Sequence, residues 1–318
     1  MVGCVIVYDN TIVAEGYHQN YGGPHAEVNA YSNLCEDIPL NECEIYVSLE
    51  PCTVYGKTPP CANLIVEKKP KIVYVGMLDP NPKVAGSGIK LIREAGIEVK
   101  VGYLKKECGS LIRKFSYYHL KKRPFITLKW AETADGYIGR LDSQKLKPKQ
   151  ISSKKNKALV HKLRANHQAI LIGANTALLD DPKLNLRYWM GNNPVKIILS
   201  KDQYLKPSLK VFKAGRTLLF ANTNEYECSD NVEVVVLDNF DLSTILSKLY
   251  ELKIQSILIE GGLHVLQAFI DANFWNEAIV FKSNLKWQNG VLAPKMSNKY
   301  LNKVHNQNND NIYTYQRE

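Results

Sequence analysis

Short apolar runs of strand length alternate with segments of helical periodicity along almost the whole of this sequence. Helices that follow strands in turn can cover the faces of a sheet, so this order predicts an α/β fold. Between residues 4 and 103 we expect strands at 5–7, 11–15, 45–47 and 72–75, and helices at 26–34, 62–67 and 89–95. A further helix is expected to begin near Leu111. Asp9-Asn10, between the first two strands, is typical of a hairpin turn.

A basic segment with a proline, Lys121-Lys122-Arg123-Pro124, interrupts the alternation. A chain of 318 residues with 45% hydrophobic residues can form two cores, and domain boundaries fall in segments of this kind. We therefore predict two domains, residues 1–120 and 121–318. The second should contain strands at 125–128, 169–172, 195–199, 217–220, 232–237, 257–259 and 278–281, and helices at 154–164, 242–252 and 265–272. The Asn-rich stretch 302–311 is expected to be a loop.

Three side chains in the first domain have the chemistry of a zinc site: His25, Cys52 and Cys61, each of which follows a proline. One imidazole and two thiolates leave the fourth position of a tetrahedral zinc ion open, as hydrolytic zinc requires and a closed structural site does not. We expect both cysteines to precede helices, whose N-termini favour thiolates. A chance His-x-Glu with an unrelated pair of buried cysteines is the alternative, and the expected position of each piece at a strand-to-helix junction disfavours it.

Glu27 lies two residues after His25. On a regular helix these side chains would point to different sides, so they can share a site only at the irregular first turn, which Pro24 favours. Glu27 is then the expected general acid–base, which moves a proton from the attacking water to a leaving amino group, as in the zinc deaminases.

The spacing of the cysteines narrows the class of deaminase. Enzymes that act on nucleic acids or free nucleosides carry Pro-Cys-x-x-Cys, whereas eight residues separate Cys52 from Cys61. This segment resembles the deaminase of riboflavin biosynthesis, as do Val2-Gly3-Cys4-Val5, Asp79-Pro80-Asn81-Pro82 and Val84-Ala85-Gly86-Ser87-Gly88. The resemblance implies a cytidine-deaminase-like fold. It also implies that His18 and Lys57 contact the substrate, a diaminopyrimidinone ribotide.

The second domain lacks a Gly-x-Gly-x-x-Gly segment after a strand, so a Rossmann-type dinucleotide site is not expected. Glu260-Gly261-Gly262 lies between an expected strand and helix, where small residues let backbone N–H groups approach a phosphate. With Lys129-Trp130-Ala131, Leu163-Arg164-Ala165, Ile172-Gly173-Ala174-Asn175-Thr176 and segment 180–187, it resembles the reductase domain of the same bifunctional family.

That resemblance implies a dihydrofolate-reductase-like fold that binds NADPH. It places Ala131, Thr176, Asp180 and the segment from Gly262 onward in the NADPH site, and Arg164, Leu184, Arg187 and Glu260 at the substrate. Arg164 and Arg187 could each form a forked contact with the ribose phosphate.

The resemblance predicts two successive reactions. Zinc-dependent hydrolysis would deaminate 2,5-diamino-6-ribosylamino-4(3H)-pyrimidinone 5′-phosphate, and NADPH would then reduce the ribosyl group to give 5-amino-6-(5-phosphoribitylamino)uracil. The chain departs from the family pattern in four places. A helix and an Asn that precede Val2 in the family are missing, Val54 replaces a His, Gln150 replaces a Trp, and segment 282–290 diverges. Two alternatives are a homologue that retains one activity and a basic, RNA-associated deaminase-like protein.

Composition restricts the compartment and the partners. No stretch is long and apolar enough to span a membrane, and seven cysteines spread over the chain favour reduced thiols. We expect a soluble, cytoplasmic homo-oligomer with no membrane or nucleic-acid partner. The net charge of +10 suits a phosphorylated small-molecule substrate or a simply solvated surface.

Overall fold

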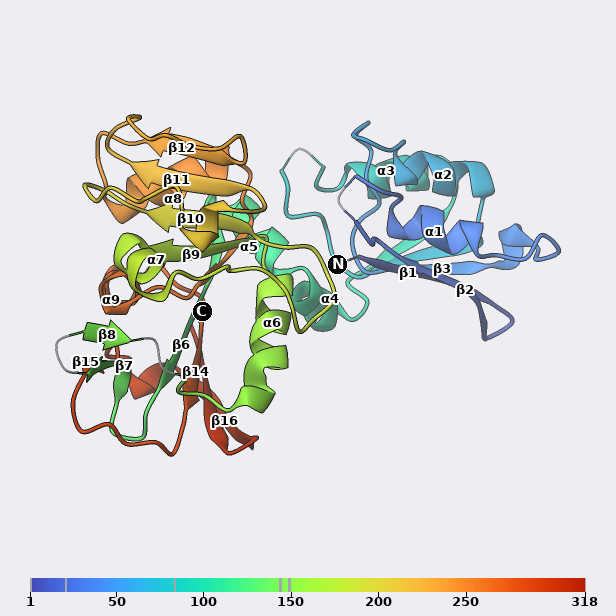
Figure 1. Cartoon of the computed structure of the whole chain (residues 1–318). Coiled ribbons are helices and arrows are strands. Elements are labelled where there is room, and N and C mark those ends of the chain that lie inside the picture. The colour runs from blue at the N-terminus through green and yellow to red at the C-terminus, as the bar shows by residue number, and fades with distance from the viewer. Residues whose placement is uncertain (1, 21, 83, 143–144, 148–149, 318) are drawn as a thin grey trace. The chain divides into compact units, whose positions relative to one another are not determined.

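The chain divides into two compact units, Met1–Lys121 and Lys122–Glu318 (Figure 1). The computed structural model describes residues 2–20, 22–82, 84–142, 145–147 and 150–317. Each unit is built on its own sheet, and the two units are described separately below.

The first unit contains a five-stranded sheet in the order β2-β1-β3-β4-β5. Its strands are β1 (Gly3–Tyr8), β2 (Thr11–Tyr17), β3 (Glu44–Val47), β4 (Ile72–Val75) and β5 (Glu98–Val101). The predicted hairpin is confirmed, because β1 and β2 pair antiparallel around Asp9 and Asn10, whose φ angles are 45° and 57°. Strands β3, β4 and β5 are parallel, so their carboxyl ends meet at one edge of the sheet.

Helices α1 (Ala26–Ser32), α2 (Cys61–Lys68) and α3 (Ser87–Glu94) cover one face of this sheet (Figure 1). They bury a core that includes Ile6, Ile45, Val73, Ile65 and Ile92. Because α2 and α3 connect parallel strands, each begins after a loop that leaves the same sheet edge. Two further helices, α4 (Lys105–Leu111) and α5 (Arg113–Lys121), complete the unit where one helix was expected.

The second unit contains a nine-stranded sheet in the order β12-β11-β10-β9-β13-β6-β14-β17-β16. The strands from β12 to β14 are parallel and are β12 (Val232–Val236), β11 (Thr217–Ala221), β10 (Val195–Leu199), β9 (Ala169–Gly173), β13 (Ser256–Ile259), β6 (Phe125–Glu132) and β14 (Glu277–Lys282). The helices are α6 (Lys157–Ala165), α7 (Ala174–Asp180), α8 (Leu242–Glu251) and α9 (Leu263–Asp271). A small second sheet holds β7 (Tyr137–Asp142), β8 (Lys145–Lys147) and β15 (Val291–Leu292).

The expectation of a loop at 302–311 is wrong. Two antiparallel strands, β16 (Leu301–Gln307) and β17 (Asp310–Gln316), form a hairpin that joins the sheet through β14. Asn308 and Asn309 form the turn with φ angles of 53° and 70°, a left-handed conformation that asparagine tolerates. The buried Asp310 then accepts a hydrogen bond from Asn156 Nδ2 at 2.7 Å, a long-range contact that composition does not reveal.

Within the described residues, every helix is too short or too polar to cross a membrane.

Candidate active sites

The three predicted metal ligands converge in the first unit. The His25 Nδ1 atom lies 3.4 Å from Cys52 Sγ and 3.3 Å from Cys61 Sγ, and the three donor atoms lie within 4.8 Å of one another. An imidazole nitrogen and two sulfurs at this separation suit one tetrahedral zinc ion with an open position. The donor set therefore fits zinc.

The first turn of α1 brings Glu27, the predicted general acid–base, to the same place. His25 is the N-cap residue of α1 and has an extended backbone, with ψ at 169°, whereas Glu27 lies inside the first turn. His25 therefore lies outside the regular helix that contains Glu27, as expected if the two side chains are to share one site. Glu27 is 3% exposed, and its burial raises the pKa of the carboxyl group.

The two cysteines lie together at the start of α2, but they belong to different segments of the chain. Cys61 is the first residue of that helix, whereas Cys52 lies earlier, in the loop that follows β3. Tertiary folding nevertheless brings Cys52 to the N-terminus of α2, because the Cys61 backbone N–H donates to Cys52 Sγ at 3.4 Å. The hydrogen bond from the Cys61 thiol lowers the pKa of Cys52.

Thr58 forms a hydrogen bond with the ring of His25. Its hydroxyl lies 3.2 Å from His25 Nε2, the ring nitrogen that faces away from the sulfurs. A partner at this nitrogen orients the ring and fixes the tautomer that leaves Nδ1 free to bind metal. Sequence reasoning missed Thr58, because no local pattern places residue 58 beside residue 25.

A buried carboxylate, Glu50, organises the loops around the metal ligands. Its Oε2 atom accepts from the backbone N–H groups of Asp79 at 3.1 Å and Gly86 at 2.9 Å. Its Oε1 atom accepts from Gly88 at 3.0 Å and Ile89 at 3.4 Å. Glu50 therefore connects the loop that carries Cys52 to the loop between β4 and α3.

The approach of these loops explains why residue 88 is glycine. A Cβ atom built on Gly88 would lie 1.9 Å from the carbonyl oxygen of Pro51, which belongs to the backbone beside Cys52. Any larger residue would push the two loops apart. Gly88 is thus a packing requirement of the loop that carries Cys52.

The predicted substrate contacts of this unit, His18 and Lys57, lie against the segment that leads into α1. The rings of His18 and His25 meet edge to face with centroids 5.4 Å apart, and His18 Nδ1 lies 3.0 Å from the Pro24 carbonyl oxygen. Lys57 is exposed, and its aliphatic chain packs on Gly22, where an added Cβ would lie 2.6 Å from Lys57 Cδ. Gly22 has a φ angle of 82°, which glycine adopts without strain.

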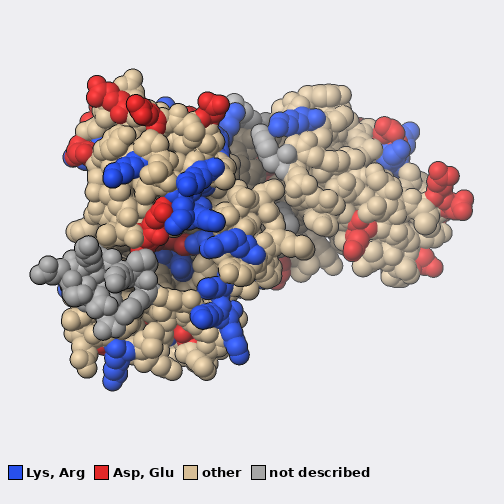
Figure 2. Space-filling model, in the orientation of Figure 1, with Lys and Arg blue, Asp and Glu red and all other residues tan. Residues whose placement is uncertain are grey.

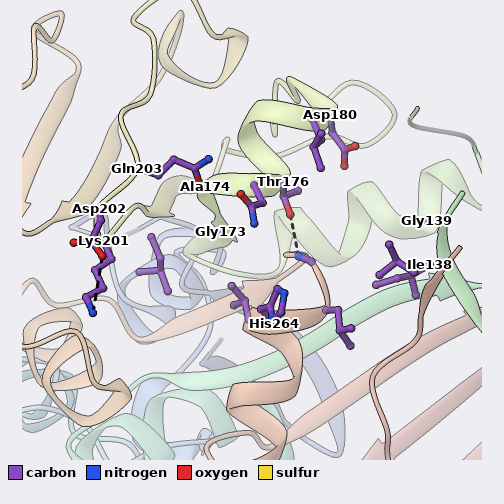
Figure 3. A pocket seen from close by; sticks show the side chains of 17 residues that line it. Ile138, Gly139, Gly173, Ala174, Thr176, Asp180, Lys201, Asp202, Gln203 and His264 are labelled. Atoms are coloured by element: carbon purple, nitrogen blue, oxygen red, sulfur yellow. Dashed lines mark hydrogen bonds and ion pairs between the residues drawn. The ribbon is translucent and has the colours of Figure 1, made fainter. Parts of the chain in front are cut away.

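The second unit contains a cavity of about 710 Å³ at the carboxyl ends of β9, β10 and β13 (Figure 3). Three of the four predicted cofactor residues line it, namely Thr176, Asp180 and Gly262. Ala131, the fourth, lies on β6 and is not among the lining residues. Leu263, His264 and Val265, which follow Gly262, line the cavity too, whereas Lys201, Asp202 and Gln203 line it and were not anticipated from the sequence.

The paired glycines let two strand-to-helix junctions pack closely. A Cβ atom on Gly261 would lie 3.2 Å from the backbone nitrogen of Gly173, and one on Gly262 would lie 3.2 Å from Thr176 Oγ1. The Gly262 N–H donates to Thr176 Oγ1 at 2.9 Å (Figure 3). The glycines thus bring the start of α9 against the start of α7 at the cavity wall.

Beside the cavity wall, Glu260 lies between two cations. Arg164 donates to it in a bidentate pair, from Nε to Oε1 at 3.0 Å and from Nη2 to Oε2 at 2.8 Å, and Lys129 Nζ lies 3.9 Å from Oε2. Burial alone would raise the pKa of Glu260, but the charges of Lys129 and Arg164 lower it to about 2. Burial also lowers the pKa of Lys129. The fork of Arg164, expected to face a phosphate, contacts Glu260 here.

Of the two arginines predicted to bind the substrate phosphate, Arg187 is the more exposed. Its side chain is exposed and lies over the Tyr188 ring, 5.8 Å from the centroid, while its backbone N–H donates to His161 Nδ1 at 3.0 Å. Burial, with the charges of Arg164 and Arg187, lowers the pKa of the accepting His161 to about 4. Figure 2 shows that Lys and Arg side chains gather on the face of this unit that carries α6.

Leu184, which was predicted to contact the substrate, is buried in the core of the second unit. Its side chain is 4% exposed and packs in a core cluster, and its backbone has a φ angle of 52°. A left-handed leucine is uncommon and marks a sharply turned backbone between Asp180 and Arg187. Gln150, which stands where the family has a Trp, is exposed, and the preceding Pro148 and Lys149 lie outside the described residues.

Two protein-family models match the chain, one in each unit. Residues 1–77 match the model described as the cytidine and deoxycytidylate deaminase zinc-binding region. Residues 124–283 match the model described as the RibD C-terminal domain.

Relatives match both units together. The riboflavin biosynthesis protein RibD of Aquifex aeolicus is 39% identical over 287 residues, which cover 88% of this chain and 79% of that protein. The RibD protein of Chlamydia pneumoniae is 37% identical over 298 residues, covering 88% and 77%. The crystal structure of a diaminohydroxyphosphoribosylaminopyrimidine deaminase/5-amino-6-(5-phosphoribosylamino)uracil reductase from Thermotoga maritima superposes with a TM-score of 0.89 at 36% identity, covering 99% of this chain and 91% of that one.

Proposed function

The chain belongs to the RibD family of bifunctional riboflavin biosynthesis proteins, and from this we infer that each unit carries one of two successive reactions. Its function is that of a deaminase and reductase of riboflavin biosynthesis, acting on a phosphorylated pyrimidine. We assign the deaminase to residues 1–120 and the NADPH-dependent reductase to residues 121–318.

In the deaminase, His25, Cys52 and Cys61 would hold the zinc ion, which when bound activates water for attack on the pyrimidine. Glu27 takes a proton from the attacking water and gives it to the leaving amino group. Its burial supports this role, because the raised pKa makes the Glu27 carboxylate a stronger acceptor for the proton of the attacking water. His18 and Lys57 would contact the ribotide beside the segment that leads into α1.

In the reductase, the cavity lined by Thr176, Asp180 and Gly262 would hold NADPH, which supplies the hydride. Conversion of a ribosyl to a ribityl group also consumes a proton. We assign its delivery to Lys129 Nζ, whose pKa burial lowers and whose position Glu260 and Arg164 define. Arg187 would bind the substrate phosphate, and the turned backbone at Leu184 would place it.

The observation that carries this assignment is the convergence of His25, Cys52 and Cys61 in one unit, with a separate cavity in the other. Two variants test it. Glu27→Gln keeps the shape of the side chain but cannot carry the proton, so deamination should fall about a hundredfold to ten-thousandfold. Arg187→Ala should raise the KM for the reductase substrate, because a charge-assisted phosphate contact is lost.

Each variant is assayed in both single steps, with the deaminated intermediate supplied for the reduction. Glu27→Gln should reduce that intermediate at the wild-type rate, and Arg187→Ala should deaminate at the wild-type rate. Loss of reduction in a folded, zinc-loaded Glu27→Gln protein would show that the two reactions do not use separate sites.

A further inference from the structure

The cavity of the second unit has two chemically different ends. In Figure 3, Thr176 and His264 lie near its middle, Lys201, Asp202 and Gln203 lie on one side, and Ile138 and Gly139 lie on the other. The first end thus carries a cation, whereas the second carries Ile138 and Gly139, with the Asp180 carboxylate between them and Thr176. A dinucleotide with a central pyrophosphate would place its two nucleosides in different surroundings.

Strand order indicates which end receives the nicotinamide. The reducing ring must lie near the substrate, and Lys129 on β6 and Glu260 after β13 mark that side. Ile138 and Gly139 lie on β7, which follows β6 along the chain after a tight turn at Thr133 and Gly136. The Ile138 end is therefore the nicotinamide end.

Lys201 lies on the opposite side. It follows β10, and the sheet order β10-β9-β13-β6 separates β10 from β6 by three strand spacings. At about 4.8 Å for each spacing, this corresponds to roughly 14 Å, which suits the distance between the two nucleosides of an extended dinucleotide. The adenosine end of the cofactor would then lie beside Lys201.

We propose that Lys201 binds the 2′-phosphate of the adenosine ribose and makes the reductase select NADPH over NADH. The two cofactors differ only in this phosphate, and among the residues that line the cavity the basic side chains are Lys201 and the more central His264. The proposal rests on the reductase function assigned above and adds the residue that sets its cofactor preference.

The charge of Lys201 is available for such a contact. Its nearest carboxylate is that of Asp202, 4.0 Å away, and both side chains are about two-thirds exposed. An ion pair of this kind is weak, and Asp202 also accepts a hydrogen bond from Asn222, which holds it in place without Lys201. A phosphate dianion can therefore attract Lys201 without breaking a buried pair.

The test compares Lys201→Ala with wild type in steady-state reduction of the deaminated intermediate, using NADPH and NADH in turn. Lys206→Ala is the matched control, since Lys206 is an exposed lysine of the same loop that does not line the cavity. Loss of one charge-assisted contact should lower kcat/KM for NADPH about tenfold to a hundredfold, with kcat/KM for NADH unchanged. Lys201→Arg should retain most of the preference.

A binding measurement separates this proposal from the assignment of the reductase itself. Calorimetric titration of the same proteins with 2′,5′-ADP and with 5′-AMP should show that wild type prefers 2′,5′-ADP and that Lys201→Ala loses the preference. Equal losses for NADPH and NADH, or an unchanged preference in both experiments, would overturn the role of Lys201. Wild-type protein that binds 2′,5′-ADP but reduces no ribosyl substrate would instead refute the reductase assignment.

Discussion

Replacing Glu50 with glutamine removes a buried carboxylate that holds two loops beside the metal ligands. The native side chain accepts four backbone hydrogen bonds, from residues 79, 86, 88 and 89. The single amide oxygen of glutamine can keep only two of these donors, and its NH₂ group faces the other two and cannot accept. The substitution is nearly isosteric, so the effect comes from hydrogen bonding rather than from packing.

The loss of stability in Glu50→Gln can be calculated from the two backbone N–H groups that lose their acceptor. Each buried donor left without a partner costs about 1–3 kcal/mol, so the first unit should lose roughly 2–6 kcal/mol of stability. At a denaturant dependence of about 2 kcal/mol per molar urea, the unfolding midpoint should fall by on the order of 1–3 M.

The two units can be followed separately in the intact protein. All four tryptophans, Trp130, Trp189, Trp275 and Trp287, belong to the second unit, so tryptophan fluorescence reports its unfolding. Release of zinc to a chromophoric chelator during urea titration reports the first unit. Glu50→Gln should shift the zinc-release midpoint and leave the fluorescence midpoint unchanged.

Glu67→Gln is the matched control, because Glu67 is 70% exposed on α2 and pairs only with the neighbouring Lys68 in the described structure. Surface changes of this kind alter stability by about 0.5 kcal/mol or less. If Glu50→Gln released zinc at the same urea concentration as Glu67→Gln, the carboxylate would not be what holds the loops together.

Two further predictions concern histidines. Thr58→Val removes the hydrogen-bond partner of His25 Nε2 and should weaken zinc binding about tenfold to a hundredfold in a competition with a chelator. Thr58→Ser keeps the hydroxyl group and should bind zinc like wild type. Equal zinc affinities for all three proteins would exclude an orienting role for Thr58. His161 has a pKa of about 4 in the folded protein and about 6.5 when unfolded, so the unfolded chain binds the proton first. Urea titrations followed by tryptophan fluorescence should therefore show the second unit losing stability as pH falls from about 6.5 to 4, and a slope as steep in His161→Gln would refute the assignment to His161.

Sequence alone was sufficient for the elements that are encoded locally. The alternation of strands and helices and the hairpin at Asp9-Asn10 follow from patterns within a few residues, and short proline-flanked motifs indicated His25, Cys52 and Cys61, which the structure brings together. Zinc accepts few side-chain types, so two cysteines and a histidine beside prolines are informative before any fold is known. The resemblance to the riboflavin family extended this to Thr176, Asp180 and Gly262, which line the cavity.

Contacts between distant residues were decided only by the tertiary structure. Arg164 pairs with Glu260, 96 positions away, instead of presenting its fork to a phosphate. Glu50 reaches the loop that follows β4, and Lys201 reaches the cavity because β10 lies two strands from β13. The Asn-rich hairpin forms because β14 offers an edge and Asn156 a partner for Asp310. Such pairings depend on which helices and strands become neighbours in the folded protein. Hydrophobic periodicity describes one helix or strand at a time. It therefore cannot specify which distant residue a side chain will contact.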